Sequence, residues 1–575
     1  MKNILVYLKG YTRECILSPA FKLFEALLEL IIPIIVAAIV DNGISQANKP
    51  YIIKMALLMV FLGAVGLTFS VIAQFFAAKA SVGFIAKVRS AMFSHIQRFS
   101  YADLDKIGTS TLITRLTSDA NQVQNGVNLT LRLFLRSPFI VFGACVAAFT
   151  IDFKAALIFV CTIPLLSVVV FGIMLISIPL YKKVQKSLDG VLLKTRENLS
   201  GARVIRAFCM EKEEIDDFCD KNTSLAKAQQ FVGKISALMN PLTYTIINLS
   251  IVILIYTGGV RVYNGVISQG SVIALYNYMS QILVELIKLA NLIISITKAV
   301  ASGNRIGDIF KVSPSMEDSG KAAQPDREKP CVAFDNVSFR YHEGAENALT
   351  GITFTAFSGE TVGIIGSTGS GKTTLINLIP RFYDVTDGSV RIYGEDVKNY
   401  SLPHLRSMVG VAPQRAVLFK GTVRENMQWA KKNATDEEIL SALEIAQAKE
   451  FVLSKDNGLD ARIEQQGGNL SGGQKQRLSL ARAVLSGSDI LILDDSSSAL
   501  DYATDAALRK ALRTLSGKTI FIVAQRTASI MHADKILVLD DGRLVDTGTH
   551  NELLKRCEVY REIHFSQYGG ENNEQ

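Results

Sequence analysis

The sequence lacks the features that mark a secreted or disulfide-stabilised protein. Its seven cysteines are odd in number and scattered, and no two of them form a C-x-x-C pair. This distribution excludes a disulfide framework and a cysteine zinc site, so we expect reduced thiols. The first residues, MKNILVYLKGYTREC, lack the short apolar core and small-residue site of a cleavable signal. We therefore expect the first hydrophobic helix to stay in the membrane.

Runs of Lys and Arg with interleaved aromatic residues are also absent, although the net charge is +8. The positively charged cytoplasmic loops of a membrane protein account for this excess, so we expect no nucleic-acid partner. The chain has 575 residues, too many for one ordinary domain, and its 49% hydrophobic content is high for a soluble protein. A membrane half, with the lipid bilayer as its partner, explains both observations.

Six apolar segments are long enough to cross a hydrocarbon core of about 30 Å. They lie at about 16–40, 55–78, 133–151, 155–179, 238–262 and 272–300. Only Asp152, Phe153 and Lys154 separate the third segment from the fourth, which predicts a tight hairpin. The stretches 79–132 and 180–237 are polar, helical in pattern and rich in Lys and Arg. The positive-inside rule places them and both termini in the cytoplasm of a multi-pass cell-membrane protein.

The composition changes after the sixth apolar segment. Residues 313–330 are polar and contain three prolines, which is typical of a linker. From Cys331 onward, β-rich runs such as TVGIIG and DILILDD alternate with helical patterns, which predicts a largely parallel sheet. We expect an all-α six-helix transmembrane domain over 1–310, a linker over 311–330 and an α/β domain over 331–575.

A glycine-rich motif, GSTGSGKTT, follows the strand TVGII. Glycines let successive backbone N–H groups converge on phosphates, Lys372 supplies a positive charge to the outer phosphates, and the Thr373 hydroxyl can ligate Mg²⁺. The Asp494 carboxylate at the end of LILD can hold the water shell of that metal. The predicted ATP-binding residues of the motif are Gly366, Ser367, Thr368, Gly369, Ser370, Gly371, Lys372, Thr373 and Thr374.

A second motif, LSGGQKQR, stands at 470–477 and is followed by LILDDSSSALD at 491–501. The order and spacing of the three motifs resemble the ABC transporter ATPases, and the chain as a whole resembles an exporter-type ABC half-transporter. The resemblance implies an α/β P-loop ABC nucleotide-binding domain that binds ATP and Mg²⁺ as part of a dimer. Two ATP molecules are then sandwiched between two such domains.

The resemblance also implies roles for residues outside the glycine-rich motif. The signature residues Ser471, Gly472, Gly473 and Gln474 contact the γ-phosphate of ATP held by the partner. Tyr341 aligns with the adenine-stacking aromatic residue, although a tyrosine at a strand end is common. Gln414 resembles the glutamine that senses Mg²⁺ and touches the membrane domain. Residues 498–501, SALD, match the loop that couples the two ATP sites.

Two positions depart from the family pattern in the hydrolytic machinery. Asp495 stands where active members have the glutamate that polarises the attacking water, and its side chain is shorter by one methylene, about 1.5 Å of reach. Gln525 stands where the family has the switch histidine. General-base catalysis is worth roughly 10² to 10⁴ in rate. We therefore predict that this chain binds ATP well and hydrolyses it poorly.

These departures, with an intact LSGGQ, resemble one half of a heterodimeric bacterial multidrug exporter. The partner is then a second ABC half-transporter that keeps the glutamate and histidine and borrows this chain's signature for the competent site. The substrates are amphipathic small molecules. A lipid or peptide exporter, an importer on the same fold and an ATP-gated channel remain alternatives.

The predicted membrane half contains ionisable residues and two segments that resemble coupling loops. Glu25 and Glu29 share a helix face in the first span, and the sixth span contains Glu285 and Lys288. Such groups at membrane depth mark a substrate cavity or form structural ion pairs, for instance Lys22 with Glu25 or Glu285 with Lys288. If the two glutamates are unpaired, lipophilic cations are the favoured cargo. Segments 99–124 and 195–214 resemble the cytoplasmic coupling loops.

Overall fold

The computed structural model describes residues 2–316, 318, 325–342, 344–496, 500–515 and 517–568. The chain divides into two compact units. The helical unit comprises Met1–Gln97 and Gly108–Ser313, and the α/β unit comprises Arg98–Ile107 and Pro314–Gln575. Within the predicted coupling loop 99–124, helix α4 (Tyr101–Ile107) belongs to the α/β unit.

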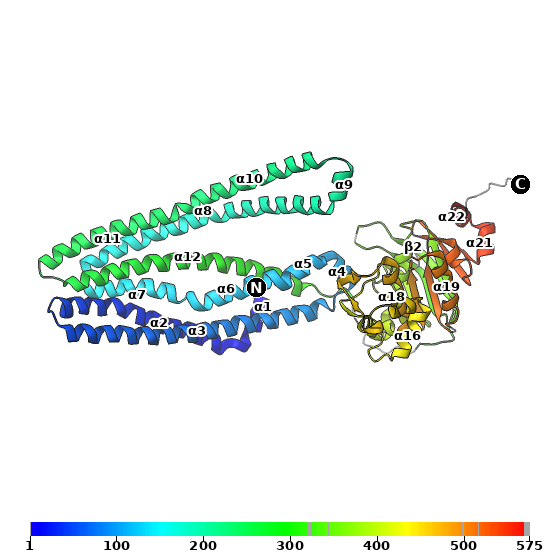
Figure 1. The fold of residues 1–575 in the computed structure, drawn as a ribbon, viewed down its shortest axis with the longest axis horizontal. Helices are drawn as coiled ribbons and strands as arrows, with labels where there is room; N and C mark the ends of the chain where they lie inside the picture. The colour runs from blue at the N-terminus through cyan, green and yellow to red at the C-terminus, as the bar shows by residue number, and fades with distance from the viewer. Residues whose placement is uncertain are drawn as a thin grey trace. The chain divides into compact units, whose positions relative to one another are not determined.

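The helical unit consists of long helices that run side by side (Figure 1). In chain order they are α1 (Lys2–Leu5), η1 (Val6–Tyr11), α2 (Thr12–Ala38), η2 (Ile39–Ile44), α3 (Lys49–Ile96), α5 (Thr109–Thr114), η3 (Arg115–Asp119), α6 (Ala120–Leu133), α7 (Arg136–Ile151), α8 (Phe153–Ser200), α9 (Ala202–Ala207), α10 (Glu211–Ala237), α11 (Met239–Tyr263) and α12 (Gln269–Lys311).

By length and composition, six helical segments of the described chain can cross a membrane. They are Val6–Ile44, Lys49–Ile96, Thr109–Ile151, Phe153–Ser200, Glu211–Tyr263 and Gln269–Lys311. Each predicted apolar segment is part of one of these, and the helices continue into the polar flanking sequence. The predicted fold class, six long apolar helices followed by an α/β domain, is confirmed.

The hairpin between the third and fourth spans is tighter than the sequence indicated. Helix α7 ends at Ile151 and α8 begins at Phe153, so Asp152 alone connects them. Asp152 is extended, and its carboxylate caps α8 by accepting from the Ala155 N–H at 2.8 Å. The same carboxylate pairs with Arg261 of α11. One residue therefore ends one helix, starts the next and anchors a third.

A buried charge cluster joins three helices of the helical unit. Arg136, at the start of α7, donates to Glu29 of α2 at 2.6 Å and to Glu285 of α12 at 2.8 Å. Glu285 also accepts from Ser137 at 2.7 Å and pairs with Lys288 at 2.8 Å. Arg136 and Glu285 are buried, Glu29 and Lys288 lie at the edge of the cluster, and the two positive and two negative groups cancel.

The α/β unit contains a sheet of six strands in the order β12-β11-β3-β10-β9-β6. Strands β11, β3, β10, β9 and β6 are parallel, as predicted, and β12 is antiparallel. A four-stranded antiparallel sheet has the order β2-β1-β4-β5, and β7 pairs with β8. The strands are β1 (Val332–Phe339), β2 (Leu349–Ala356), β3 (Thr361–Gly366), β4 (Asp387–Ile392), β5 (Glu395–Asp396), β6 (Val409–Ala412), β7 (Gly421–Thr422), β8 (Arg462–Ile463), β9 (Ile490–Asp494), β10 (Thr519–Val523), β11 (Lys535–Asp540) and β12 (Arg543–Gly548).

Further helices of the α/β unit pack against the six-stranded sheet or against one another. They are α13 (Lys372–Leu378), α14 (Leu402–Ser407), α15 (Val423–Gln428), α16 (Asp436–Ile445), α17 (Lys449–Leu453), α18 (Gly472–Leu485), α19 (Tyr502–Leu512), α20 (Thr527–Ile530), α21 (His550–Arg556) and α22 (Glu558–Tyr568). Strand β9 is fully buried, with Ile490 and Ile492 in one apolar core and Leu491 and Leu493 in another. Because β9 is a parallel strand that is buried on both faces, its residues are apolar up to Asp494, where the strand ends.

The buried cluster yields a stability prediction. Arg136→Gln leaves Glu29 without its arginine partner and leaves Lys288 as the cationic partner of Glu285. We expect this substitution to lower the free energy of unfolding by about 3–5 kcal/mol. The measurement is unfolding of the purified protein in detergent, followed by circular dichroism. Lys311→Gln removes an exposed ion pair with Asp308 and is the control, with an expected effect within about 0.5 kcal/mol.

Adding Glu29→Gln to Arg136→Gln removes the orphaned carboxylate and leaves Glu285 paired with Lys288. We expect the double substitution to recover part of the lost stability, because the cost comes from an unpaired buried charge. If the losses of unfolding free energy caused by the two single substitutions simply add in the double substitution, the charged residues do not act as a coupled unit.

Candidate active site

The loop after β3 is shaped for close backbone approach to a ligand. A Cβ atom on Gly366 would lie 2.0 Å from the carbonyl oxygen of Leu539, and Gly371 has a φ of +92° that side chains rarely adopt. The Lys372 ammonium donates to the carbonyls of Gly366 at 2.9 Å and Ser367 at 2.7 Å. Burial lowers the pKa of Lys372, while the carboxylates of Asp494 and Asp495 oppose this.

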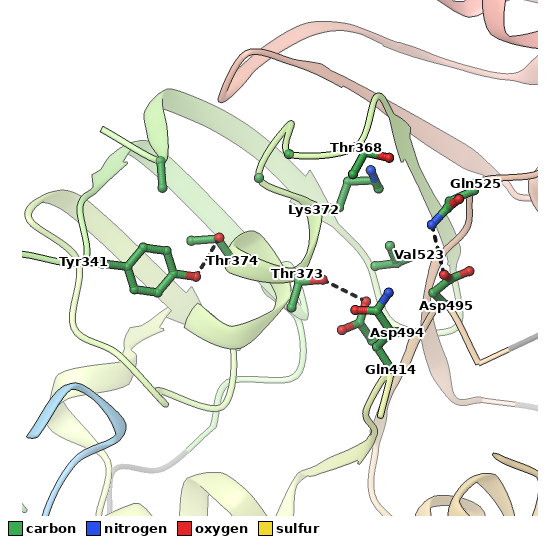
Figure 2. A pocket seen from close by; sticks show the side chains of 13 residues that line it. Tyr341, Thr368, Lys372, Thr373, Thr374, Gln414, Asp494, Asp495, Val523 and Gln525 are labelled. Atoms are coloured by element: carbon green, nitrogen blue, oxygen red, sulfur yellow. Dashed lines mark hydrogen bonds between the residues drawn. The ribbon is translucent and has the colours of Figure 1, made fainter. Parts of the chain in front are cut away.

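This loop borders a cavity of about 290 Å³. Tyr341 lies at one end, and Asp495 and Gln525 lie at the other (Figure 2). The cavity is lined by Tyr341, Ala348, Thr368, Gly369, Gly371, Lys372, Thr373, Thr374, Gln414, Asp494, Asp495, Val523 and Gln525. The sequence analysis named eleven of these thirteen residues and missed Ala348 and Val523, which have no polar side chain to reveal them.

Four neighbouring parallel strands place the polar side chains. Strand β3 leads into the glycine-rich loop, and β6, β9 and β10 end just before Gln414, Asp495 and Gln525. The carboxyl ends of parallel strands meet at one edge, which is where open α/β sheets bind ligands. Residues far apart in sequence therefore meet in one cavity.

The metal-binding residues predicted from the sequence are in contact. The Thr373 hydroxyl donates to the Asp494 carboxylate at 3.1 Å (Figure 2). Burial raises the pKa of Asp494, and the hydroxyl of Thr373 opposes that rise. A hydroxyl and a carboxylate side by side suit Mg²⁺, which prefers oxygen ligands.

The glycine-rich loop also contains a buried hydroxyl. Ser370 is 2% exposed and does not line the cavity, and its Oγ has no hydrogen-bond partner within the described residues. Buried polar groups are normally paired, so this orphaned hydroxyl is consistent with a loop that rearranges around phosphate oxygens. The residues present therefore fit ATP with Mg²⁺.

The two departures from the family pattern contact each other. The Gln525 side-chain amide donates to the Asp495 carboxylate at 3.1 Å (Figure 2). Asp495 is 7% exposed and has a left-handed φ of +46°. Burial raises the pKa of Asp495, while a hydrogen bond from Gln414 and the charge of Lys372 hold it down. The carboxylate is thus held by neighbouring side chains.

The signature motif lies outside this cavity. Ser471 caps α18, its Oγ accepting from the Gln474 N–H at 3.3 Å while Gln474 Oε1 accepts from the Ser471 N–H at 3.0 Å. Residues 470–474 are all described, and none lines the cavity. In the segment 498–501, Ser498 and Ala499 lie outside the described residues, and Asp501 caps α19 by accepting from the Thr504 N–H at 2.8 Å.

Comparison with known proteins identifies the family. The family model for the ABC transporter transmembrane region matches residues 15–286, and the family model for the ABC transporter ATPase, described as ABC transporter, matches residues 349–498. An uncharacterised ABC transporter ATP-binding protein of Bacillus subtilis strain 168, YfiB, is 36% identical over 574 residues, which is 100% of both chains. The chain belongs to the ABC transporter family.

Further similarities place this ABC transporter among the exporter-type half-transporters. A putative multidrug export ATP-binding/permease protein of Bacillus subtilis strain 168, YgaD, is 31% identical over 574 residues, 98% of each chain. The structure of a bacterial Atm1-family ABC exporter with ATP bound has the same fold, with a TM-score of 0.79, 23% identity and 99% of each chain covered. The ABC transporter is therefore a multi-pass membrane protein with one ATPase domain.

The two predicted coupling segments of the ABC transporter each contain a short helix. Helix α4 packs within the α/β unit, where the Tyr383 hydroxyl donates to Asp105 at 2.8 Å and the Tyr101 ring lies 4.7 Å from the Phe382 ring. In segment 195–214, α9 joins α8 to α10, and it carries exposed apolar side chains, among them Val204.

The ionisable residues predicted in the first and sixth spans are paired. Lys22 donates to Glu25 at 2.5 Å, and Arg136 joins Glu29 and Glu285, which also pairs with Lys288. The condition for lipophilic-cation selectivity, an unpaired glutamate pair, is therefore not met. The sequence analysis missed Arg136, although an arginine inside the apolar stretch 133–151 was a signal for it.

The phosphate loop yields a binding prediction. We expect Lys372→Ala to weaken labelling of this chain by an azido-ATP photoprobe by roughly tenfold or more, because the outer phosphates lose their charged partner. Lys420→Ala, at an exposed position away from the cavity, is the control. Undiminished labelling of Lys372→Ala would contradict the assignment.

Proposed function

We propose that this chain is the hydrolysis-impaired half of a heterodimeric bacterial ABC exporter of amphipathic compounds in the cell membrane. The hydrogen bond from Gln525 to Asp495 carries the proposal. It ties a carboxylate oxygen to the amide that replaces the switch histidine. The shorter aspartate is thereby kept from the position of an attacking water, and the base contribution of roughly 10² to 10⁴ is lost.

In this proposal the chain binds ATP well although it hydrolyses ATP poorly. Gly366 to Thr374 would cradle the phosphates, Tyr341 would stack on adenine, and Thr373, Asp494 and Gln414 would hold Mg²⁺. When bound, the metal would neutralise charge on the phosphates. The chain then binds ATP at its own site, and Ser471, Gly472, Gly473 and Gln474 complete the site of the partner half-transporter.

Exposed apolar side chains on the second coupling segment support a partner subunit. In the single chain Val204 and Phe208 are 60% and 73% exposed at the tip formed by α9. Large apolar side chains that are exposed on a polar segment indicate that another protein surface packs against them. We infer that ATP-driven closure of the two ATPase domains moves the membrane helices through α4 and α9.

The multidrug assignment draws on the similarity to the putative multidrug export protein. A lipid or peptide exporter and an importer on the same fold are the alternatives for cargo. An ATP-gated channel is the alternative for mechanism. Uptake of a fluorescent amphiphile into inverted vesicles against its gradient distinguishes a pump from a channel, because a channel passes only downhill flux.

The asymmetry of the two ATP sites yields the principal prediction. In the purified pair, Ser471→Ala in this chain should lower steady-state ATP hydrolysis by roughly tenfold or more, because the signature serves the competent site. Asp495→Asn should lower it by less than about twofold, because this position lacks an effective base. Phosphate release is the measurement.

A matched control separates catalysis from helix capping. Thr435 caps α16 with the same reciprocal bonds that Ser471 makes on α18. Thr435→Ala therefore removes an equivalent capping box, worth about 1 kcal/mol, and should leave hydrolysis near the wild-type rate. If Asp495→Asn silences hydrolysis as fully as Ser471→Ala, the chain is a working ATPase with an aspartate base.

The assignment of Glu25, Glu29, Glu285 and Lys288 to a substrate cavity stays a prediction, and their ion pairs favour the structural alternative. We expect Glu29→Gln to slow transport of cationic and neutral amphiphiles to the same extent, because Glu29 neutralises Arg136. Initial rates for two dyes of matched lipophilicity test this. A loss confined to the cationic dye would restore the cavity role of Glu29.

A further inference from the structure

The loop that carries the switch position is held by the last helix of the described chain. Gln525 follows β10, and Thr527 begins α20. Gln567 of α22 bridges them: its Nε2 donates to the Gln525 carbonyl at 2.7 Å, and its Oε1 accepts from the Thr527 N–H at 2.8 Å. One side chain therefore binds the backbone on both sides of Arg526.

The chemistry of these two contacts requires an amide side chain. A carbonyl needs a donor and an N–H needs an acceptor, and a primary amide supplies both. Glutamate would offer only acceptors and would place a carboxylate oxygen against the Gln525 carbonyl. Alanine would offer neither group. Gln567 thus acts as a backbone partner for a segment that leaves the sheet.

A second residue of α22 contacts the same loop. The His564 Nδ1 lies 3.0 Å from the Thr527 hydroxyl, which also lies 3.2 Å from Gln567 Oε1. Thr527 is fully buried, so its hydroxyl depends on these partners. The His564 ring is packed in turn against the rings of Tyr560 and His550, at 6.5 Å and 5.3 Å.

The side chain of Gln525 points the other way, into the nucleotide cavity. Its amide donates to Asp495 at the end of the cavity that lies opposite Tyr341 (Figure 2). Lys372 lines the cavity near this end, where the outer phosphates belong. The backbone of Gln525 is therefore fixed from behind by α22 while its side chain faces the γ-phosphate position.

We propose that Gln567 and His564 are positioning residues that hold Gln525 at the γ-phosphate end of the pocket, so that α22 sets how long ATP stays at this site. The inference rests on the proposed ATP site and not on which subunit hydrolyses ATP. A substitution that breaks the contacts between α22 and the loop should therefore speed the release of ATP from this chain.

The test uses the complex of this chain with its partner half-transporter. The complex is loaded with a radiolabelled azido-ATP, chased with excess unlabelled ATP for increasing times, and then irradiated, and the label on this chain is followed. We expect Gln567→Ala and the isosteric Gln567→Glu to speed loss of label by about three- to tenfold, the effect of one or two hydrogen bonds. Ser566→Ala, a neighbour on α22 whose hydroxyl donates to the Ile563 carbonyl of the same helix, should match the wild type.

A double substitution decides whether α22 acts through Gln525. Gln525→Ala removes the group that faces the nucleotide but keeps the backbone that Gln567 binds. In that background Gln567→Ala should have no further effect on the release rate. An undiminished effect would overturn the inference, and so would a lower unfolding temperature of Gln567→Ala with an unchanged release rate.

The outcome is separable from failure of the ATP site itself. The proposed ATP site is wrong if the wild-type chain takes up no label, or if Lys372→Ala does not abolish the labelling. If the wild-type chain holds label and Gln567→Ala releases it at the same rate, only the positioning role is wrong.

Discussion

Two adjacent carboxylates at the end of a buried strand constrain the whole nucleotide pocket. Asp494 and Asp495 are 4% and 7% exposed, and burial raises the pKa of both. Neighbouring carboxylates in a low-dielectric interior need compensating groups. Lys372, Thr373 and Gln525 supply these. Lys372 and Thr373 begin α13 after the loop that follows β3, and Gln525 follows β10. The parallel order of the sheet is therefore what makes the site possible.

The same constraint acts in the helical unit, where Arg136 and Glu285 are buried between helices. Arg136 is 8% exposed and is shared between Glu29 and Glu285. An isolated charge there would cost several kcal/mol, so the charges occur as a neutral group that ties α2, α7 and α12 together. Of the two roles that the sequence left open for these carboxylates, the cluster favours the structural ion pair over the substrate cavity.

Much of the architecture was predictable because it depends on local patterns. Apolar segments of spanning length predict six membrane helices, and alternating β-rich and helical runs predict a parallel sheet. The lengths of the helices were not predictable in the same way. Helix α3 runs over 48 residues, because the polar sequence beyond its apolar part keeps helical periodicity without a strong stop signal.

The sequence by itself determined the family, the order of the ATP motifs and the two unusual residues, Asp495 and Gln525, because each depends on residue type and short spacing. Only the tertiary structure decided that these two side chains bind each other, that Arg136 neutralises Glu29, and that Gln567 holds the loop of Gln525. The reason is that such contacts join segments brought together by packing. No local periodicity or motif encodes which distant side chain a buried polar group will meet.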